Sequence, residues 1–313
     1  MRPQRKEITL LLGFLIAFLP FTLYVIETMI EIKLGRRVDM FEAHSKNDME
    51  MTNLSTEYEE QTLETRETLY AKTSDEGDHA VSTSTMTQWT IMLVVNDGFF
   101  DFFQNWFQYY KKLALHLPIT IIADDDIVYE KLKSACSYCS VLRSQLNISE
   151  AAGFKDTKYD EIVTTRPLHI LGMLRRGIDV LYVDIDSVWL HNPLTYFNNS
   201  VECILQFDAP GVICTGFMAF KSNPRTIKLL QQWHKALELK PGKNQPVFNR
   251  VFRLNKGLLT CQELSTVHFP SGMQYFKHFS DSDRAKVVVV HNNWIIGHDV
   301  KKERFKTFNL WGI

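Results

Sequence analysis

The sequence has few cysteines and no excess of either charge. Among its 313 residues are five cysteines, and 35 lysines and arginines face 36 acidic residues, a formal net charge of −1. A near-zero charge without a basic, aromatic stripe argues against a nucleic-acid surface. Cys136 and Cys139 form one C-x-x-C pair with no second pair, which disfavours a zinc knuckle. No histidine follows this pair directly, which excludes haem attachment.

The small set of cysteines nevertheless suits an oxidising compartment, with one cysteine left over. Cys203 and Cys214 flank a turn that contains Pro210 and Gly211, so they could bridge two neighbouring strands. Cys261 is the remaining cysteine outside the C-x-x-C pair. The sequence leaves the pairing open.

Charged residues are absent from residues 8–26. At about 1.5 Å per residue, this run covers roughly 28 Å, close to the thickness of the hydrocarbon core. No small-x-small cleavage site follows it, so we expect a retained membrane anchor over residues 8–30 after a cytosolic tail of residues 1–7. Basic residues on both sides of the run leave its orientation undecided by charge. A lumenal C-terminal part is favoured by the sequons at Asn53, Asn147 and Asn198.

Aromatic residues and a sustained apolar period are scarce in residues 31–86, where Ser, Thr and Glu dominate. Such a segment buries little apolar surface, and we expect a largely disordered stem. Residues 87–313 are richer in apolar and aromatic residues, and their number is ample for one α/β domain.

Strand and helix patterns alternate through the first half of residues 87–313, which predicts a mostly parallel sheet with flanking helices. We expect strands at 88–95, 118–123, 139–142 and 180–183, and helices at 99–113 and 127–134. Pro167 suits a first helical turn, so a further helix is predicted from Pro167 to Arg176. Beyond it we expect strands at 201–207, 214–220 and 287–290, and helices at 224–239 and 246–253.

The apolar strand Val180–Val183 leads directly into Asp184 and Asp186. In α/β sheets, ligands bind beyond the carboxyl ends of strands, and residues i and i+2 of an extended chain share a side. Two carboxylates placed in this way predict a site for Mn²⁺ or Mg²⁺. Asp124–Asp126 compete for this role, although acids at a helix start are explained by the helix dipole.

Four motifs in a fixed order carry a family resemblance: VLYVDIDSVWLHNP at 180–193, CTGF at 214–217, NQPVFN at 244–249 and HNNWIIG at 291–297. Together they resemble the nucleotide-diphospho-sugar transferase family, which includes the plant rhamnogalacturonan xylosyltransferases, over nearly all of residues 87–311. The resemblance implies a GT-A fold, a UDP-sugar donor, a divalent cation such as Mn²⁺ and transfer with retention. It also implies a single-pass type II Golgi protein whose catalytic domain is lumenal and whose acceptor is a glycan or glycoprotein.

Residue by residue, the resemblance assigns Asp184 and Asp186 to the metal and the donor, with His291 as the third metal ligand. Asn96 and Asp97, which follow the first strand, fall where the nucleoside is contacted; an Asn-Asp-Gly turn explains them equally well.

The resemblance places further residues around the donor. Thr215 and Gly216 match a loop beneath the donor sugar, and Arg166 reaches the donor from the preceding helix or is a solvated charge at the helix start. Gln245, or a backbone carbonyl, would shield the reacting carbon, while relatives commonly have Asp at the position of Asn244. Gly297 and Lys301 match loosely a motif whose lysine contacts the diphosphate. His298 and Asn293 are alternatives to His291 as the third metal ligand.

Two other functions remain open from the sequence. A haloacid-dehalogenase-like phosphatase would use Asp184 as nucleophile and Asp186 as acid/base, with Asp281 and Asp283 as its later acidic pair. That motif normally opens its fold, whereas strand–helix units begin here well upstream. A non-catalytic UDP-sugar-binding homologue is the second alternative, because Asn244 lacks a charge. The sequence does not choose between xylose and galactose as the donor sugar, and it does not identify the acceptor.

Overall fold

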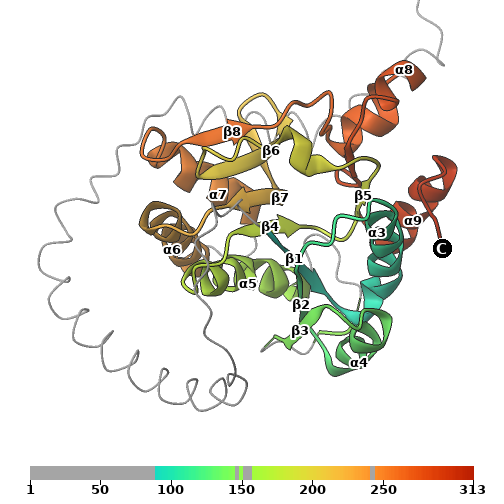
Figure 1. Ribbon diagram of the computed structural model, residues 1–313, viewed down its shortest axis with the longest axis horizontal. Coiled ribbons are helices and arrows are strands. Elements are labelled where there is room, and N and C mark those ends of the chain that lie inside the picture. Colours follow the sequence, from blue (N-terminus) through green and yellow to red (C-terminus); the bar gives the residue numbers. More distant parts are fainter. Residues whose placement is uncertain (1–88, 145–147, 151–156, 240–243) are drawn as a thin grey trace, which may run out of the picture. The chain divides into compact units, whose positions relative to one another are not determined.

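The computed structural model describes residues 89–144, 148–150, 157–239 and 244–313. Its centre is a seven-stranded sheet with the order β3-β2-β1-β4-β7-β6-β8 (Figure 1). The strands are β1 (Thr90–Val95), β2 (Ile119–Ala123), β3 (Ser140–Arg143), β4 (Val180–Val183), β6 (Cys203–Ala209), β7 (Val212–Phe220) and β8 (Cys261–Glu263).

Strand direction divides this sheet into two parts. Strands β3, β2, β1 and β4 are mutually parallel, whereas β7 runs antiparallel to both β4 and β6, and β8 is parallel to β6. The sheet is therefore mixed and mostly parallel, with flanking helices, as the alternating sequence pattern predicts. Its parallel part ends at β4, the strand that leads into Asp184.

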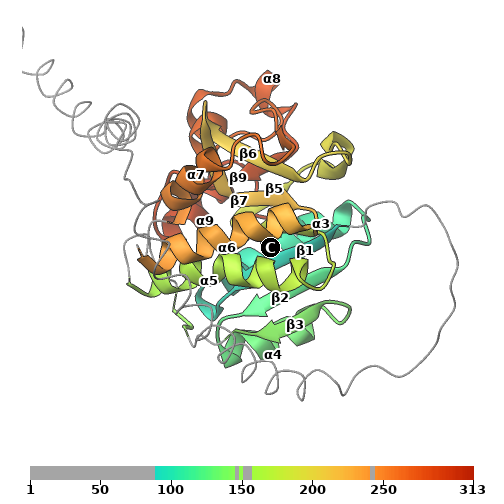
Figure 2. The same cartoon turned by 90° about the vertical axis from the view of Figure 1, so that its left-hand side faces the viewer.

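Helices cover both faces of the sheet. Alternate side chains of β4 separate the two cores: Leu181 and Val183 pack in the cluster of α3 (Phe100–Lys112) and α4 (Asp126–Ala135). Val180 and Tyr182 pack in the other cluster, which contains α5 (Thr157–Leu174), α6 (Pro224–Leu239) and α7 (Asn244–Leu254). Figure 2 shows α5 and α6 side by side in front of the strands. The short runs of apolar residues in the strands are thus explained by burial on both faces.

A small second sheet joins the end of the chain to the segment that follows β4. Strand β5 (Ser187–Trp189) pairs antiparallel with β9 (Val289–His291), with Ser187 opposite His291. Helix α9 (His298–Thr307) contributes Phe305 to the adjoining core. The remaining elements are η1 (Asp97–Phe99), η2 (Pro193–Tyr196), the π-helix η3 (Gln274–His278) and α8 (Asp281–Arg284).

The prediction that Pro167 opens a helix is wrong, because α5 begins at Thr157 and contains Pro167 in its interior. Proline has no N–H and is usually unfavourable inside a helix. Here the helix continues through the proline, and burial anchors the residues next to it and after it: Arg166 is 8% exposed, and Ile170 and Leu174 lie in the core. Tertiary packing overrides the local preference.

The suggested bridge between Cys203 and Cys214 is also wrong. Cys203 forms a disulfide with Cys261, because β6 and β8 are parallel neighbours with these two cysteines opposite each other. A second disulfide joins Cys136 to Cys139 after α4, and Cys214 is free and buried. The short β8 was not predicted, so its pairing with β6 was not available from the sequence.

The predicted tail, anchor and stem over residues 1–86 lie outside the described residues. Within the described ranges, no helix combines the length and the apolar character that crossing a membrane requires.

Candidate functional site

Backbone hydrogen bonds hold Asp184 and Asp186 between the two sheets. The N–H of Asp184 donates to the carbonyl of Gly216 on β7 at 2.7 Å. The carbonyl of Asp186 accepts from the N–H of Asn292, just beyond β9, at 2.8 Å, and the Ser187 hydroxyl donates to the carbonyl of Asp184 at 2.8 Å. The two carboxylates are therefore fixed by β7 on one side and by the C-terminal segment on the other.

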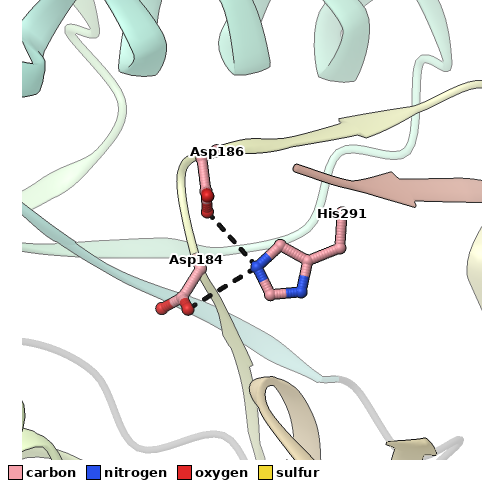
Figure 3. A group of neighbouring side chains, drawn as sticks. All are labelled: Asp184, Asp186 and His291. Carbon is pink, nitrogen blue, oxygen red and sulfur yellow. Dashed lines mark ion pairs between the residues drawn. The ribbon is translucent and has the colours of Figure 1, made fainter. Parts of the chain in front are cut away.

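Asp184, Asp186 and His291 converge on one point (Figure 3). His291 Nε2 lies 3.3 Å from Asp186 Oδ1 and 3.8 Å from Asp184 Oδ2, and one ligand atom of each residue lies within 4.8 Å of the others. Two ligands of one Mg²⁺ or Mn²⁺, each about 2.1 Å from the ion, are separated by roughly 3–4 Å. Two carboxylates and an imidazole are also a suitable donor set for Mn²⁺. The residues fit a divalent cation.

Gly216 makes this convergence sterically feasible. A Cβ atom at position 216 would collide with Asp184 Oδ2 and with Cε1 of His291. The glycine is required here for close approach of the β7 backbone to both side chains, and not for an unusual backbone angle. The predicted Thr215–Gly216 loop is thus part of the β7 strand and lies directly against the triad.

Arg166 and Tyr182 hold the Asp184 carboxylate from the opposite side. Arg166 Nη2 donates to Asp184 Oδ1 at 3.0 Å, and the Tyr182 hydroxyl donates to the same oxygen at 2.8 Å. The guanidinium also donates to the carbonyl and hydroxyl oxygens of Thr215 at 2.9 and 3.2 Å. Because Arg166 is buried in these contacts, its interpretation as a solvated charge at a helix start is wrong.

Lys301 reaches Asp186 from α9. Its Nζ lies 2.5 Å from Asp186 Oδ2, and Gly297 forms the turn before the helix with a φ of 102°. Burial raises the pKa of Asp186, but the charges of Lys301 and His291 outweigh it and hold this pKa well below its usual value. The site therefore presents a deprotonated Asp186 at neutral pH.

Cys214 is the partner of His291 on the side away from the carboxylates. Its Sγ lies 3.3 Å from His291 Nδ1, and burial raises the pKa of the Cys214 thiol to about 11. When Nε2 serves as a metal ligand, Nδ1 carries the hydrogen and donates it to this sulfur, an outer contact that fixes the ring orientation. Burial lowers the pKa of His291, but Cys214 and Asp186 raise it well above its usual value.

Gln245 lies beside Thr215 and binds Asp208, an acid that the sequence analysis did not select. Gln245 Oε1 accepts from the N–H of Thr215 at 3.3 Å, and its Nε2 donates to Asp208 Oδ2 at 2.9 Å. Asn293 Nδ2 donates to the other oxygen of Asp208 at 2.7 Å. Asp208 is a carboxylate near the end of β6, so the strand-end rule that selects Asp184 could have found it. Asn244 is buried at the start of α7.

Asn96 and Asp97 lie at the end of β1, away from the triad's own contacts. Asn96 Nδ2 donates to the carbonyl of Glu150 at 2.6 Å, and Asp97 Oδ1 lies 2.5 Å from Lys131 Nζ. The N–H of Asp97 donates to Asp125 Oδ2 at 2.8 Å. Their predicted contact with the nucleoside stays a prediction.

The competing acids do not join the triad. Asp125 caps α4 by accepting from the N–H of Val128 at 2.8 Å, as expected for an acid at a helix start. Burial raises the pKa of Asp124 to about 7. The acids proposed for a phosphatase, Asp281 and Asp283, lie on α8 and pair with Arg284 and with Lys286 just after the helix. His298 pairs with Asp101 and not with the triad's carboxylates.

The fold and the site define an α/β protein with a candidate divalent-cation site at the end of a central strand. A family model described as nucleotide-diphospho-sugar transferase matches residues 114–305, and the chain belongs to that family. This membership confirms the resemblance that the four motifs carry, and it removes the support for a phosphatase.

Relatives of known activity are glycosyltransferases. UDP-D-xylose:L-fucose alpha-1,3-D-xylosyltransferase 3 of Arabidopsis thaliana is 26% identical over 251 residues, which cover 71% of this chain and 66% of the relative's length. UDP-galactose:fucoside alpha-3-galactosyltransferase of Dictyostelium discoideum is 30% identical over 195 residues, or 52% of this chain and 30% of that protein. The glycosyltransferase GlyE of Streptococcus pneumoniae TIGR4, a solved structure, has a TM-score of 0.46 and 14% identity, covering 71% of this chain and 60% of that chain.

Proposed function

We propose that this protein transfers a sugar from a UDP-sugar to a fucose-containing acceptor with the help of a divalent cation, Mn²⁺ being the best fit. The proposal rests on one observation above all, the convergence of Asp184, Asp186 and His291 against Gly216 at the end of β4. Membership of the nucleotide-diphospho-sugar transferase family supplies the class of donor.

The choice of acceptor is supported by what the relatives share. The plant relatives are named for transfer of xylose to L-fucose, and the Dictyostelium relative for transfer of galactose to a fucoside. The donor sugar differs between them, while fucose and an alpha-3 linkage recur in both names. We therefore propose an α-1,3 linkage to fucose on a glycan or glycoprotein, with xylose and galactose as the candidate donor sugars.

Basic groups around the triad suit the charge of a departing nucleotide. A cation held by Asp184, Asp186 and His291 would act as a Lewis acid for the leaving diphosphate. Lys301 and Arg166 add positive charge on either side of the two carboxylates, and fixed charges of this kind stabilise a leaving group without reorganisation.

The geometry also bears on the stereochemistry. We propose transfer with retention in which Gln245 shields the reacting carbon, and its contact with Thr215, which lies beside Gly216, supports this role. Asn244 begins the same helix with its side chain buried, so it serves the shape of this region.

We also propose a single-pass type II arrangement in the Golgi, with residues 87–313 in the lumen. The two disulfides suit an oxidising compartment. The sequon residue Asn198 is exposed, as a glycosylated side chain must be.

The activity is tested with the full-length, detergent-solubilised protein, UDP-xylose, UDP-galactose or UDP-glucose, and Mn²⁺. UDP release is measured with methyl α-L-fucoside, with methyl α-D-galactoside or without an acceptor, and the product linkage is determined by NMR. We expect fucoside-dependent release that EDTA abolishes. Asp184→Ala and His291→Ala should lose at least about 100-fold in kcat/KM, as for removal of charge-stabilising groups.

The matched control is Asp281→Ala, which removes a fully exposed acid on α8 and should leave the rate unchanged. Metal-dependent UDP binding without turnover on any acceptor would instead support the non-catalytic alternative. UDP release at the same rate with and without the fucoside would show that only the proposed acceptor is wrong.

A further inference from the structure

Asp208 is a buried carboxylate to which the proposed chemistry assigns no role. It lies near the end of β6 and is 7% exposed. Each of its oxygens accepts one side-chain amide hydrogen: Oδ2 from Gln245 Nε2 at 2.9 Å, and Oδ1 from Asn293 Nδ2 at 2.7 Å. One side chain of β6 thus binds α7 and the segment after β9 at the same time.

The far end of each amide is also engaged. Gln245 Oε1 accepts from the N–H of Thr215 at 3.3 Å, and Asn293 Oδ1 accepts from the N–H of Gly272 at 2.6 Å. Rotating either amide by half a turn would set its NH₂ group against a backbone N–H and its oxygen against a carboxylate. Asp208 and these two N–H groups therefore permit a single orientation of each amide.

Both amides are connected to the triad through neighbouring residues. Thr215, the partner of Gln245, accepts two hydrogen bonds from Arg166, and Arg166 binds Asp184. Asn293 follows His291 by two residues, and its carbonyl accepts from Arg304 Nη2 at 2.6 Å. A change at Asp208 is consequently transmitted to the candidate catalytic side chain and to the segment that carries the third metal ligand.

Only a carboxylate can perform this task. Its two oxygens accept from two NH₂ groups, whereas an asparagine at the same place would offer one oxygen and one NH₂ group. The NH₂ group would face another donor, leaving a buried polar group without a partner, which is costly.

We propose that Asp208 is a positioning residue that fixes the amide orientations of Gln245 and Asn293, with Gln245 Oε1 directed to Thr215. This inference rests on the proposed transferase function for its kinetic consequence. Its structural part stands on the hydrogen bonds alone.

The test is a double-mutant cycle that reverses the polarity of one hydrogen bond. Asp208→Asn should lower kcat at least about tenfold while the donor KM changes less than about threefold, since Asp208 acts through Gln245. Gln245→Glu alone sets two carboxylates against each other and should lower both kcat and the thermal unfolding midpoint.

In the double variant Asp208→Asn/Gln245→Glu, the amide at position 208 donates to the carboxylate at position 245, which still accepts from the N–H of Thr215. Gln245→Glu should therefore lower the unfolding midpoint and kcat when Asp208 is present, and raise both when position 208 is asparagine. Two independent sites would not show such a reversal of sign. The expected rescue is a recovery of the unfolding midpoint and of part of kcat.

Glu202→Gln is the matched control, because Glu202 is another buried carboxylate, directly before the same strand, with Arg225 and Thr260 as partners. It should lower the unfolding midpoint and leave kcat within about twofold. If Gln245→Glu is equally harmful in both backgrounds, or if the double variant does not fold, the proposal is wrong. If the protein shows no transfer at all, the proposed function is wrong. The unfolding midpoints of the variants still test whether Asp208 fixes the two amide orientations.

Discussion

Gly216 shows how strictly one position can depend on the absence of a side chain. The β7 backbone passes so close to Asp184 and His291 that an added methyl group must displace one of them. At Gly172, inside α5, a Cβ atom would meet nothing within 4 Å beyond its chain neighbours and the helix's own backbone. The two glycines therefore separate a local packing effect at the site from the general effect of adding a methyl group.

We predict that Gly216→Ala lowers the Mn²⁺-dependent affinity for UDP at least about tenfold, because moving Asp184 or His291 by a fraction of an ångström disturbs ligand geometry. Isothermal titration of UDP with and without Mn²⁺ measures the change. Gly172→Ala should keep the affinity and raise stability by up to about 1 kcal/mol, since alanine is the better helix former. Tight metal-dependent binding by Gly216→Ala would show that the triad does not hold the metal.

The sequence predicted the residues of the site unevenly. Asp184 and Asp186 follow a recognisable buried strand, and His291 ends an apolar run, so simple rules for strand ends indicate all three. Asp208 also lies near a strand end, but it occurs singly, and its importance depends on Gln245 and Asn293, which are distant in the sequence. The partnership of Arg166 with Thr215 and Asp184 likewise depends on the packing of α5 against the sheet.

Helix α9 is attached to α3 by a cluster of charges. Asp101 Oδ1 lies 2.9 Å from His298 Nε2, and Asp101 Oδ2 lies 2.9 Å from Lys302 Nζ. Burial lowers the pKa of His298, but its contacts with Asp101 and Asp299 outweigh this and raise the pKa above its ordinary value. Burial raises the pKa of Asp101, but the same histidine and Lys302 lower it.

A pH dependence follows for this attachment. Because the pKa of His298 is raised in the folded state, its contribution is fully present below the unfolded value of about 6.5 and is lost as the pH rises through the folded value. We predict that His298→Gln lowers the free energy of unfolding by on the order of 1 kcal/mol at pH 6 and by much less at pH 9.

Urea unfolding of parent and variant at the two pH values measures this difference. His278→Gln, which changes an exposed histidine on η3, is the control and should show no such trend. An equal loss for His298→Gln at pH 6 and pH 9 would mean that the ring's packing against Phe99 and Phe102, and not its charge, holds α9.

At the scale of elements, the sequence was most informative where burial and local preference agree. The bounds of β4 and α6 were predicted as they are found, because an apolar β-branched run and a proline-started amphipathic helix are local signals. The start of α5 was missed because Pro167, which usually lies in a first helical turn, is in the interior of this helix. The pairing of β5 with β9 joins segments about a hundred residues apart, and no local pattern contains that information.

For the whole molecule, we predict that residues 87–313 are lumenal. Expressed in a secretory-competent cell, the protein should gain gel mobility after endoglycosidase treatment, and Asn198→Gln should remove one glycan, because Asn198 is exposed. Protease added to sealed microsomes should leave this part intact. An unglycosylated, protease-accessible domain on membrane-bound protein would overturn the topology.

Because β5 pairs with β9, the site needs residues that the ribosome makes about a hundred positions after Asp184 and Asp186. While the ribosome is still adding residues beyond β7, Asp184 and Asp186 already exist, but neither His291 nor Lys301 has been made. The strand that covers Ser187–Trp189, and the side chains that neutralise the two acids, are made only about a hundred residues after the acids themselves. On a nascent chain the centre of the site therefore stays incomplete until β9 and α9 have been made.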